Sequence, residues 1–197
     1  LTVLLFFFHL RVFDEHKDYA EDLEHHPERI LQRGWITLRD LKWVGGIAIL
    51  VQCALASLQG NASLVSWLLA FIFSVLMLKE FFVPRWLKRH FLVYAISHLC
   101  VMPLLALSVF SFTMQRPFWE APGWFVVYAF VGLLVTFNWE ISRKIRAPED
   151  EREGLDSYTK IFGTYGAARM VLVVRILDTA IVALVGWHLK LAPWFYV

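Results

Sequence analysis

The stretch WVGGIAILVQCALASLQGNASLVSWLLAFIFSVLML (residues 43–78) contains 36 residues and no charged side chain. A single membrane-spanning helix needs about 20 apolar residues, so this run is too long for one span. The pair Gly60-Asn61 near its middle is typical of a turn. The run therefore predicts two membrane helices, near 43–59 and near 63–80, joined by a short connection.

Three further apolar segments are also expected to span the membrane. We place them near 90–111, with a kink at Pro103, near 121–139 and near 168–189. The last of these carries Arg175 and Asp178, and ionised side chains inside a membrane usually pair with one another. Residues 1–10 are interpreted as the end of another membrane helix, and we expect the chain to be truncated at both ends.

The bulk composition is typical of an integral membrane protein, here predicted as a single transmembrane domain over residues 1–197. Hydrophobic residues make up 58% of the chain and charged residues 18%, whereas a soluble domain is about half apolar and about a quarter charged. The formal net charge of +2 gives no reason to expect a nucleic-acid partner. Two cysteines, both within apolar runs, exclude a disulfide scaffold.

Lysine and arginine are concentrated in alternate connections between the apolar segments. The segments 11–42, 79–89 and 140–169 hold most of them, whereas the connections 60–62 and 112–120 hold only Arg116. Basic connections of a membrane protein usually stay on the cytoplasmic side. The alternation therefore predicts that the three charged loops are cytoplasmic and the two short connections lie on the opposite side.

A row of carboxylates follows the first apolar segment. Asp14, Asp18 and Asp22 are spaced four residues apart, so on a helix they share one face. Like charges at this spacing repel, and oxygen ligands of this kind suit Mg²⁺, which bridges carboxylates to substrate phosphates. Arg29 follows, and its guanidinium could hold phosphate oxygens. The pattern favours a Mg²⁺–diphosphate site, with a solvated helix face as the alternative.

This region resembles the first signature of the UbiA superfamily of intramembrane prenyltransferases, N-D-x-x-D-x-x-x-D followed by R-P-[IL]-x-x-G. The chain reads Asp14-Glu15-x-x-Asp18-x-x-x-Asp22, then Arg29-Ile30-Leu31-Gln32-Arg33-Gly34. The Asn, the adjacent Asp and the Pro of the signature are replaced by Asp14, Glu15 and Ile30.

The superfamily's second signature, D-x-x-D-x-x-x-D followed by G-x-x-T-x-x-x-x-x-G, resembles residues 143–163. Its last aspartate, first glycine, threonine and last glycine fall on Asp150, Gly154, Ser157 and Gly163. The two earlier aspartates fall on Arg143 and Arg146, so cations replace two carboxylates. Nearby carboxylates that could substitute through a shift in register are Glu140, Glu149 and Glu151.

The resemblance implies an all-α, polytopic membrane helix bundle of nine helices around a central cavity, of which this chain would supply about six membrane segments. It implies Mg²⁺-dependent transfer of a prenyl group from a polyprenyl diphosphate to an unknown acceptor within the lipid bilayer, with release of diphosphate. The residues that it implies as catalytic are Asp14, Asp18, Asp22 and Asp150. The implied metal ligands are these four and Glu149, and the implied substrate-binding residues are Arg29, Lys88, Arg143, Lys144 and Arg146.

Several alternatives stay open at this point. Arg143, Lys144 and Arg146 can form a diphosphate clamp or a positively charged anchor at the membrane surface. The same fold could serve a membrane-bound terpene cyclase, which uses no acceptor. A divalent-cation transporter and a non-catalytic membrane protein are further alternatives. Transporter sites lie near the bilayer midplane, and the position of these carboxylates at the ends of apolar segments argues against permeation.

Overall fold

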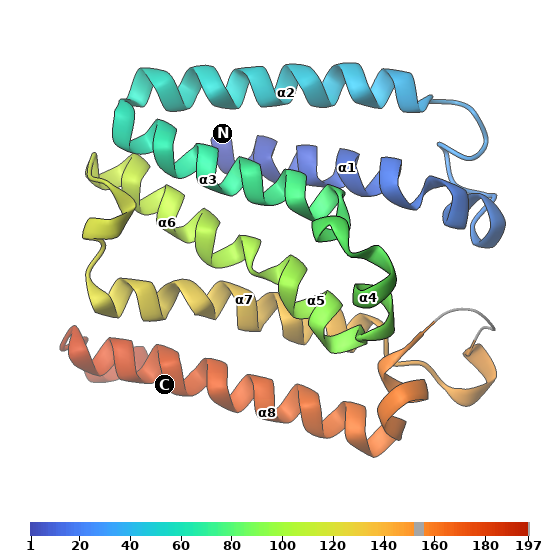
Figure 1. The fold of residues 1–197 in the computed structure, drawn as a ribbon. Coiled ribbons are helices and arrows are strands. Elements are labelled where there is room, and N and C mark those ends of the chain that lie inside the picture. The colour runs from blue at the N-terminus through green and yellow to red at the C-terminus, as the bar shows by residue number, and fades with distance from the viewer. Residues whose placement is uncertain (152–155, 197) are drawn as a thin grey trace. The chain divides into compact units, whose positions relative to one another are not determined.

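The computed structural model describes residues 1–151 and 156–196, and these residues form helices without any strand. The longer helices are α1 (Thr2–His25), α2 (Leu38–Gln59), α3 (Asn61–Leu78), α4 (Pro84–Arg89), α5 (Phe91–Leu99), α6 (Val101–Met114), α7 (Gly123–Arg143) and α8 (Tyr158–His188) (Figure 1). Short 3-10 turns are η1 (Glu80–Phe82), η2 (Phe118–Glu120), η3 (Pro148–Asp150) and η4 (Pro193–Tyr196). The predicted all-α polytopic bundle is confirmed. Gly154 of the second signature lies outside the described residues.

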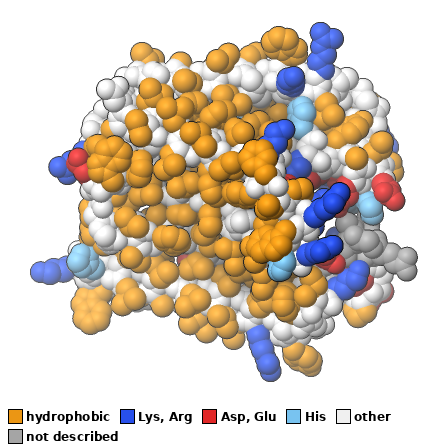
Figure 2. Space-filling model, viewed as in Figure 1, with side chains coloured by type: hydrophobic (Ala, Val, Ile, Leu, Met, Phe, Trp, Pro, Cys, Tyr) orange, Lys and Arg blue, Asp and Glu red, His pale blue; other side chains and the backbone are white. Residues whose placement is uncertain are grey.

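Within the described residues, five segments are long and apolar enough to cross a membrane: Leu38–Gln59, Asn61–Leu78, Phe91–Met114, Gly123–Arg143 and Tyr158–His188. They correspond to the five spans expected from the uncharged runs. Figure 2 shows hydrophobic side chains over the helices in view and charged side chains gathered near helix ends. Such apolar surfaces are what a lipid bilayer would cover. The apolar residues 1–10 belong to α1, which continues unbroken into the acidic row.

Two helices begin earlier than the hydropathy suggested, because polar caps extend them. The Thr37 hydroxyl accepts from the Asp40 backbone N–H at 3.2 Å, and the Asp40 carboxylate accepts from the Thr37 N–H at 2.9 Å. This capping box starts α2 at Leu38 rather than near 43. Ser157 accepts from the Lys160 N–H at 2.9 Å and starts α8 at Tyr158 rather than near 168.

The segment that contains Pro103 is interrupted three residues before the proline. α5 ends at Leu99, Cys100 adopts a turn, and α6 begins at Val101. Proline has no N–H, so the carbonyl of Leu99, four residues earlier, cannot receive its helical hydrogen bond. The helix is therefore interrupted at Cys100, three residues before the proline at which a kink was expected.

The chain divides into two compact units, each described here by itself. Unit 1 comprises Leu1–Trp86 and Ser108–Glu120, and unit 2 comprises Leu87–Leu107 and Ala121–Val197. In unit 1, α2 packs against both α1 and α3, and in unit 2, α7 packs along α8 and against α5 (Figure 1). The single transmembrane domain over residues 1–197 stays a prediction.

A buried hydrogen-bond network joins three helices of unit 1. His9 of α1, Gln52 of α2, and Trp67 and Ser74 of α3 are each no more than 3% exposed. The Gln52 amide nitrogen can only donate, so His9 Nδ1, 3.2 Å away, accepts. The His9 Nε2–H then donates to Ser74 Oγ at 3.1 Å, and Trp67 Nε1 donates to Gln52 Oε1 at 3.2 Å. The network sets the register of the three helices relative to one another.

The core of unit 2 lies between α7 and α8. Its buried members are Phe137, Ile141, Tyr158, Ala167 and Val174. The Phe91 ring of α5 meets the Tyr158 ring edge to face at 4.8 Å between centroids, a geometry that aromatic pairs prefer. This core holds the first turn of α8 against α7. It thereby positions the loop that joins them.

Gly163 interrupts the regular geometry of α8, with φ 72° and ψ 165°. Only glycine adopts this region readily, and a side chain there costs about 1–3 kcal/mol of strain. No atom lies within 4 Å of the position that a Cβ would take, so the cost of Gly163→Ala would come from the backbone alone. We expect this variant to unfold at a lower mole fraction of sodium dodecyl sulfate in mixed micelles.

Gly46→Ala is the matched control for that experiment. Gly46 lies within α2, with a helical backbone and no atom within 4 Å of the position that a Cβ would occupy. Alanine is favoured over glycine inside a helix by about 0.5–1 kcal/mol, so this variant should unfold no earlier than the natural chain. Equal destabilisation by both substitutions would contradict the role given to Gly163.

Candidate functional site

The three predicted aspartates lie on α1, as their spacing required. Asp14, Asp18 and Asp22 occupy successive turns of one continuous helix, beyond its apolar first half. The side chains of Asp14 and Asp18 are 51% and 46% exposed, and that of Asp22 is 16% exposed. The helix thus presents two half-exposed carboxylates and one more covered carboxylate at its polar end.

Lys17 offsets part of the repulsion within this row. Its ammonium lies 3.6 Å from Asp14 Oδ1 and 3.8 Å from Asp18 Oδ1. Burial nevertheless raises the pKa of Asp18 above its ordinary value; Lys17 opposes this shift, and the neighbouring carboxylates add to it. One ammonium therefore does not fully compensate this cluster, and a further cation would stabilise its ionised form.

Arg29 reaches back to the third aspartate of the row. Its guanidinium forms an ion pair with the Asp22 carboxylate, seven residues earlier. The loop between α1 and α2 is closed locally, because the Arg33 N–H donates to the Arg29 carbonyl at 2.9 Å and Gly34 adopts a positive φ of 76°. Arg29, predicted to bind phosphate, is thus held at the acidic row.

Lys88 lies on the short helix α4, where its side chain is exposed. The chain enters this helix through η1, whose residues Glu80, Phe81 and Phe82 all have positive φ values, between 46° and 61°. No ion pair of Lys88 occurs within the described part of the chain. The predicted contact of Lys88 with the substrate therefore stays a prediction.

The carboxylate of Glu140 is held by two of the predicted substrate-binding cations. Arg143 Nη2 and Nε lie 2.5 and 2.7 Å from Glu140 Oε2, and Lys144 Nζ lies 2.8 Å from Oε1. Both oxygens of Glu140 thus have a cationic partner, so this residue is poorly suited to replace a missing metal ligand. Glu149 and Asp150 lie on η3, and both are exposed.

Glu151 is held by the start of α8. The hydroxyls of Ser157 and Thr159 donate to its Oε1 at 2.5 and 2.7 Å. These bonds hold the pKa of Glu151 below its usual value, with nearby Arg146 and Lys160 acting in the same direction. The Arg146 backbone N–H donates in turn to Thr159 Oγ1 at 3.1 Å. This hydroxyl cluster (Arg146 N–H, Glu151, Ser157, Thr159) joins both ends of the α7–α8 loop.

The two acidic segments differ in how well they suit a magnesium ion. No group of three or more His, Cys, Asp or Glu side chains converges on one point within residues 1–151 and 156–196. The row on α1 still supplies paired, half-exposed oxygen donors with excess negative charge, which fit a hard cation that keeps several waters. Among the described residues of the α7–α8 loop, the exposed carboxylates are Glu149, Asp150 and Asp156, and Arg143, Lys144 and Arg146 precede them.

Sequence reasoning gave no role to Lys17 or Thr159, and it considered Glu151 only as a possible substitute metal ligand. Lys17 lies three residues after Asp14, and side chains at this spacing are neighbours on a helix. The sequence could therefore have indicated this contact. Glu151 and Thr159 come together only through the folded loop, for which the sequence carries no periodic signal. The predicted pair of Arg175 and Asp178 is confirmed at 3.2 Å within α8.

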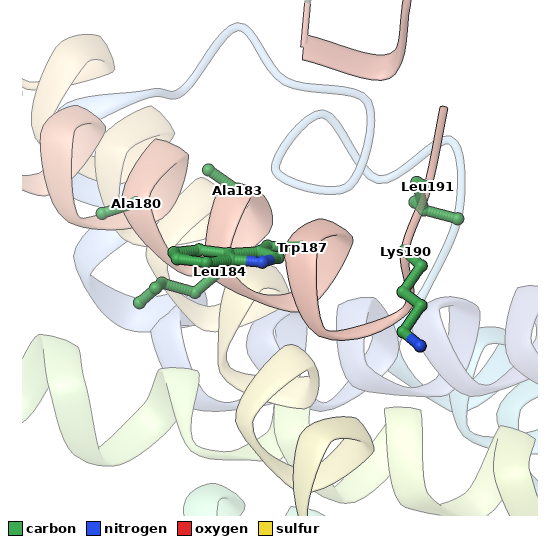
Figure 3. Close-up of a pocket in the computed structure, with 6 residues that line it drawn as sticks. All are labelled: Ala180, Ala183, Leu184, Trp187, Lys190 and Leu191. Carbon is green, nitrogen blue, oxygen red and sulfur yellow. The ribbon is translucent and has the colours of Figure 1, made fainter. Parts of the chain in front are cut away.

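A separate hollow of about 790 Å³ lies at the carboxyl end of α8. Its lining residues are Ala180, Ala183, Leu184, Trp187, Lys190 and Leu191. Figure 3 shows the Trp187 ring beside Leu184 on the helix, with Lys190 and Leu191 on the turn that follows. None of the predicted site residues is among the described residues that line this hollow, and none of those lining side chains is a carboxylate.

Five helices that suit a bilayer define the class: a multi-pass membrane protein, which also carries an acidic row at the polar end of α1. The chain matches the model of the UbiA prenyltransferase family over residues 1–197. It belongs to that family, and at this level it is an intramembrane prenyltransferase. No curated protein and no solved structure matches the chain significantly.

Proposed function

We propose that this protein catalyses Mg²⁺-dependent transfer of a prenyl group from a polyprenyl diphosphate to an acceptor within the bilayer, with release of diphosphate. The observation that carries the proposal is the row of Asp14, Asp18 and Asp22 at the polar end of an otherwise apolar helix. Membership of the prenyltransferase family supports the same reaction class. The loops 11–42, 79–89 and 140–169 are proposed to face the cytoplasm.

The first segment is proposed to bind the metal and, through it, the diphosphate. Asp14 and Asp18 would contact Mg²⁺ through their exposed oxygens, and Asp22 would orient Arg29 towards phosphate oxygens. Bound Mg²⁺ would neutralise charge on the leaving diphosphate and so favour its departure. Lys17, between the first two carboxylates, would offset part of their repulsion in the absence of the ion.

The second segment is proposed to bind diphosphate mainly through cations. Arg143 and Lys144 are held in place by Glu140, and Arg146 follows on the loop. Guanidinium groups match phosphate oxygens in pairs, which makes them suitable replacements for a metal-bound contact. Asp150 and Glu149, exposed on η3, are the proposed metal ligands here, and Lys88 on α4 is a further proposed phosphate contact.

The direct test uses the full-length protein, purified in detergent. Geranyl, farnesyl and geranylgeranyl diphosphate are titrated with and without Mg²⁺, while thermal stability and diphosphate release are followed. Mg²⁺-dependent stabilisation accompanied by release is the expected result. The absence of both effects with all three diphosphates would overturn the proposed function.

Arg146→Ala tests whether the basic residues of the α7–α8 loop bind substrate or only anchor the loop. We expect this substitution to weaken Mg²⁺-dependent diphosphate binding by at least about tenfold, because a charge-assisted hydrogen bond contributes roughly 1.5–3 kcal/mol. Isothermal titration with inorganic diphosphate measures the change.

Arg169→Ala is the matched control for that measurement, because Arg169 is an exposed cation of the same basic segment. If these cations only anchor the loop, both variants should insert differently into the membrane. Both should then bind diphosphate with the affinity of the natural protein. A diphosphate clamp requires that only Arg146→Ala reduces the affinity. Equal affinities for both variants and the natural protein would rule the clamp out.

A further inference from the structure

The hydroxyls of Ser157 and Thr159 both lie within hydrogen-bond distance of Glu151 Oε1, and they lie 3.0 Å from each other, where either one can be the donor. The Arg146 N–H donates to Thr159 Oγ1, so the Thr159 proton is free to donate to Glu151 Oε1 at 2.7 Å. The Lys160 N–H donates to Ser157 Oγ, so the Ser157 proton likewise points to Glu151 Oε1 at 2.5 Å. One carboxylate oxygen thus receives both hydroxyls, and bonds of this kind to an ionised acceptor are strong.

These contacts connect three separate pieces of backbone. Arg146 lies just beyond the end of α7, Glu151 follows η3, and Ser157 and Thr159 begin α8. Glu151 therefore links the segment that follows η3 to the first turn of α8. Because Thr159 also accepts from Arg146, the position of the Arg146 main chain depends on the same carboxylate.

We propose that Glu151 is a positioning residue. It accepts hydrogen bonds from the hydroxyls of Ser157 and Thr159 and thereby holds Arg146 in position to bind the substrate diphosphate. This inference rests on the proposed function, because it assigns a role within the diphosphate site. It differs from metal ligation: what the position requires is an oxygen acceptor for two hydroxyls. An amide oxygen meets that requirement, whereas a methyl group does not.

The test compares Glu151→Ala and Glu151→Gln in the full-length protein. The first readout is hydrogen exchange of the Arg146 amide, and the second is the affinity for inorganic diphosphate in the presence of Mg²⁺. We expect Glu151→Ala to accelerate the exchange and weaken the affinity, each by about tenfold, the size of one lost hydrogen-bond network. Glu151→Gln should stay within about threefold of the natural protein in both, since it retains the acceptor oxygen.

Substitutions on the other side of the cluster extend the test. Thr159→Val should reproduce Glu151→Ala, and Thr159→Ser should behave as the natural protein does. The double variant Glu151→Ala/Thr159→Val should lose no more than either single variant, because both break one connected network. Asp156→Ala is the control, since Asp156 is exposed in the same loop and lies outside the cluster.

The possible failures are distinguishable. A natural protein that does not bind diphosphate at all would overturn the proposed function and this inference with it. Diphosphate binding by the natural protein that Glu151→Ala leaves unchanged would overturn the inference alone. Equal losses in Glu151→Gln and Glu151→Ala would also overturn it, because they would show that the charge is needed, as expected of a metal ligand.

Discussion

Asp18→Asn is expected to abolish Mg²⁺-dependent turnover of prenyl diphosphates, with a loss on the order of a hundredfold or more. Asp18 is the central carboxylate of the row on α1, and it shares Lys17 with Asp14. Burial and the neighbouring carboxylates raise the pKa of Asp18, which means that its ionised form is destabilised. A bound cation would therefore stabilise this carboxylate directly. An amide keeps the shape of the side chain and removes the charge that attracts the ion.

The measurement is diphosphate release at saturating Mg²⁺, with thermal unfolding in detergent as the check that the variant is folded. Glu24→Gln is the matched control, because Glu24 is an exposed acid on the same helix and lies outside the row. Both substitutions remove one negative charge from α1. Turnover by Asp18→Asn equal to that of Glu24→Gln would show that the row does not bind the catalytic ion.

Much of the helical arrangement could be predicted from the sequence, because it depends on properties that individual segments carry. The uncharged run 43–78 is too long for one span and has the turn signal Gly60-Asn61 near its middle, so two helices follow. The four-residue spacing of Asp14, Asp18 and Asp22 likewise needs only a helix to bring the side chains onto one face. Predictions of this kind use local periodicity and require no knowledge of tertiary contacts.

Helix boundaries were less predictable, because polar residues decide them. Hydropathy detects only the apolar part of a helix, whereas Thr37 and Ser157 begin α2 and α8 several residues earlier. The same limitation applies to the α7–α8 loop. Arg143 and Arg146 were recognisable as departures from a signature, but the acceptor that fastens this loop, Glu151, is identified by contacts across it.

The buried network of unit 1 shows a further limit of reasoning from composition. Gln52 lies within the uncharged run 43–78 and has no charge or motif that marks it. Its importance follows from its partners on two other helices, His9 and Trp67. A polar side chain within a membrane span is costly unless its hydrogen-bonding groups are satisfied. The structure shows that Gln52 satisfies this condition by joining α1, α2 and α3.

Gln52→Leu is therefore expected to destabilise the protein by about 3 kcal/mol, through the loss of partners for His9 Nδ1 and Trp67 Nε1. Each buried polar group left without a partner costs roughly 1–3 kcal/mol, although hydrogen bonds within membranes are often weaker, at about 0.6 kcal/mol. The higher value is expected here because one side chain serves both groups. Leucine has a similar volume, so the change should create little cavity.

Unfolding in mixed micelles with increasing sodium dodecyl sulfate measures this effect, and Gln59→Leu provides the control on the same helix. Gln59 is exposed and donates a single hydrogen bond, to the Phe112 carbonyl at 2.9 Å, so its loss should cost far less. His9→Leu in the Gln52→Leu background should add little, since the two side chains act in one network. Equal stability of the two glutamine variants, or full additivity of the His9 and Gln52 substitutions, would mean that the three helices are held together by apolar packing alone.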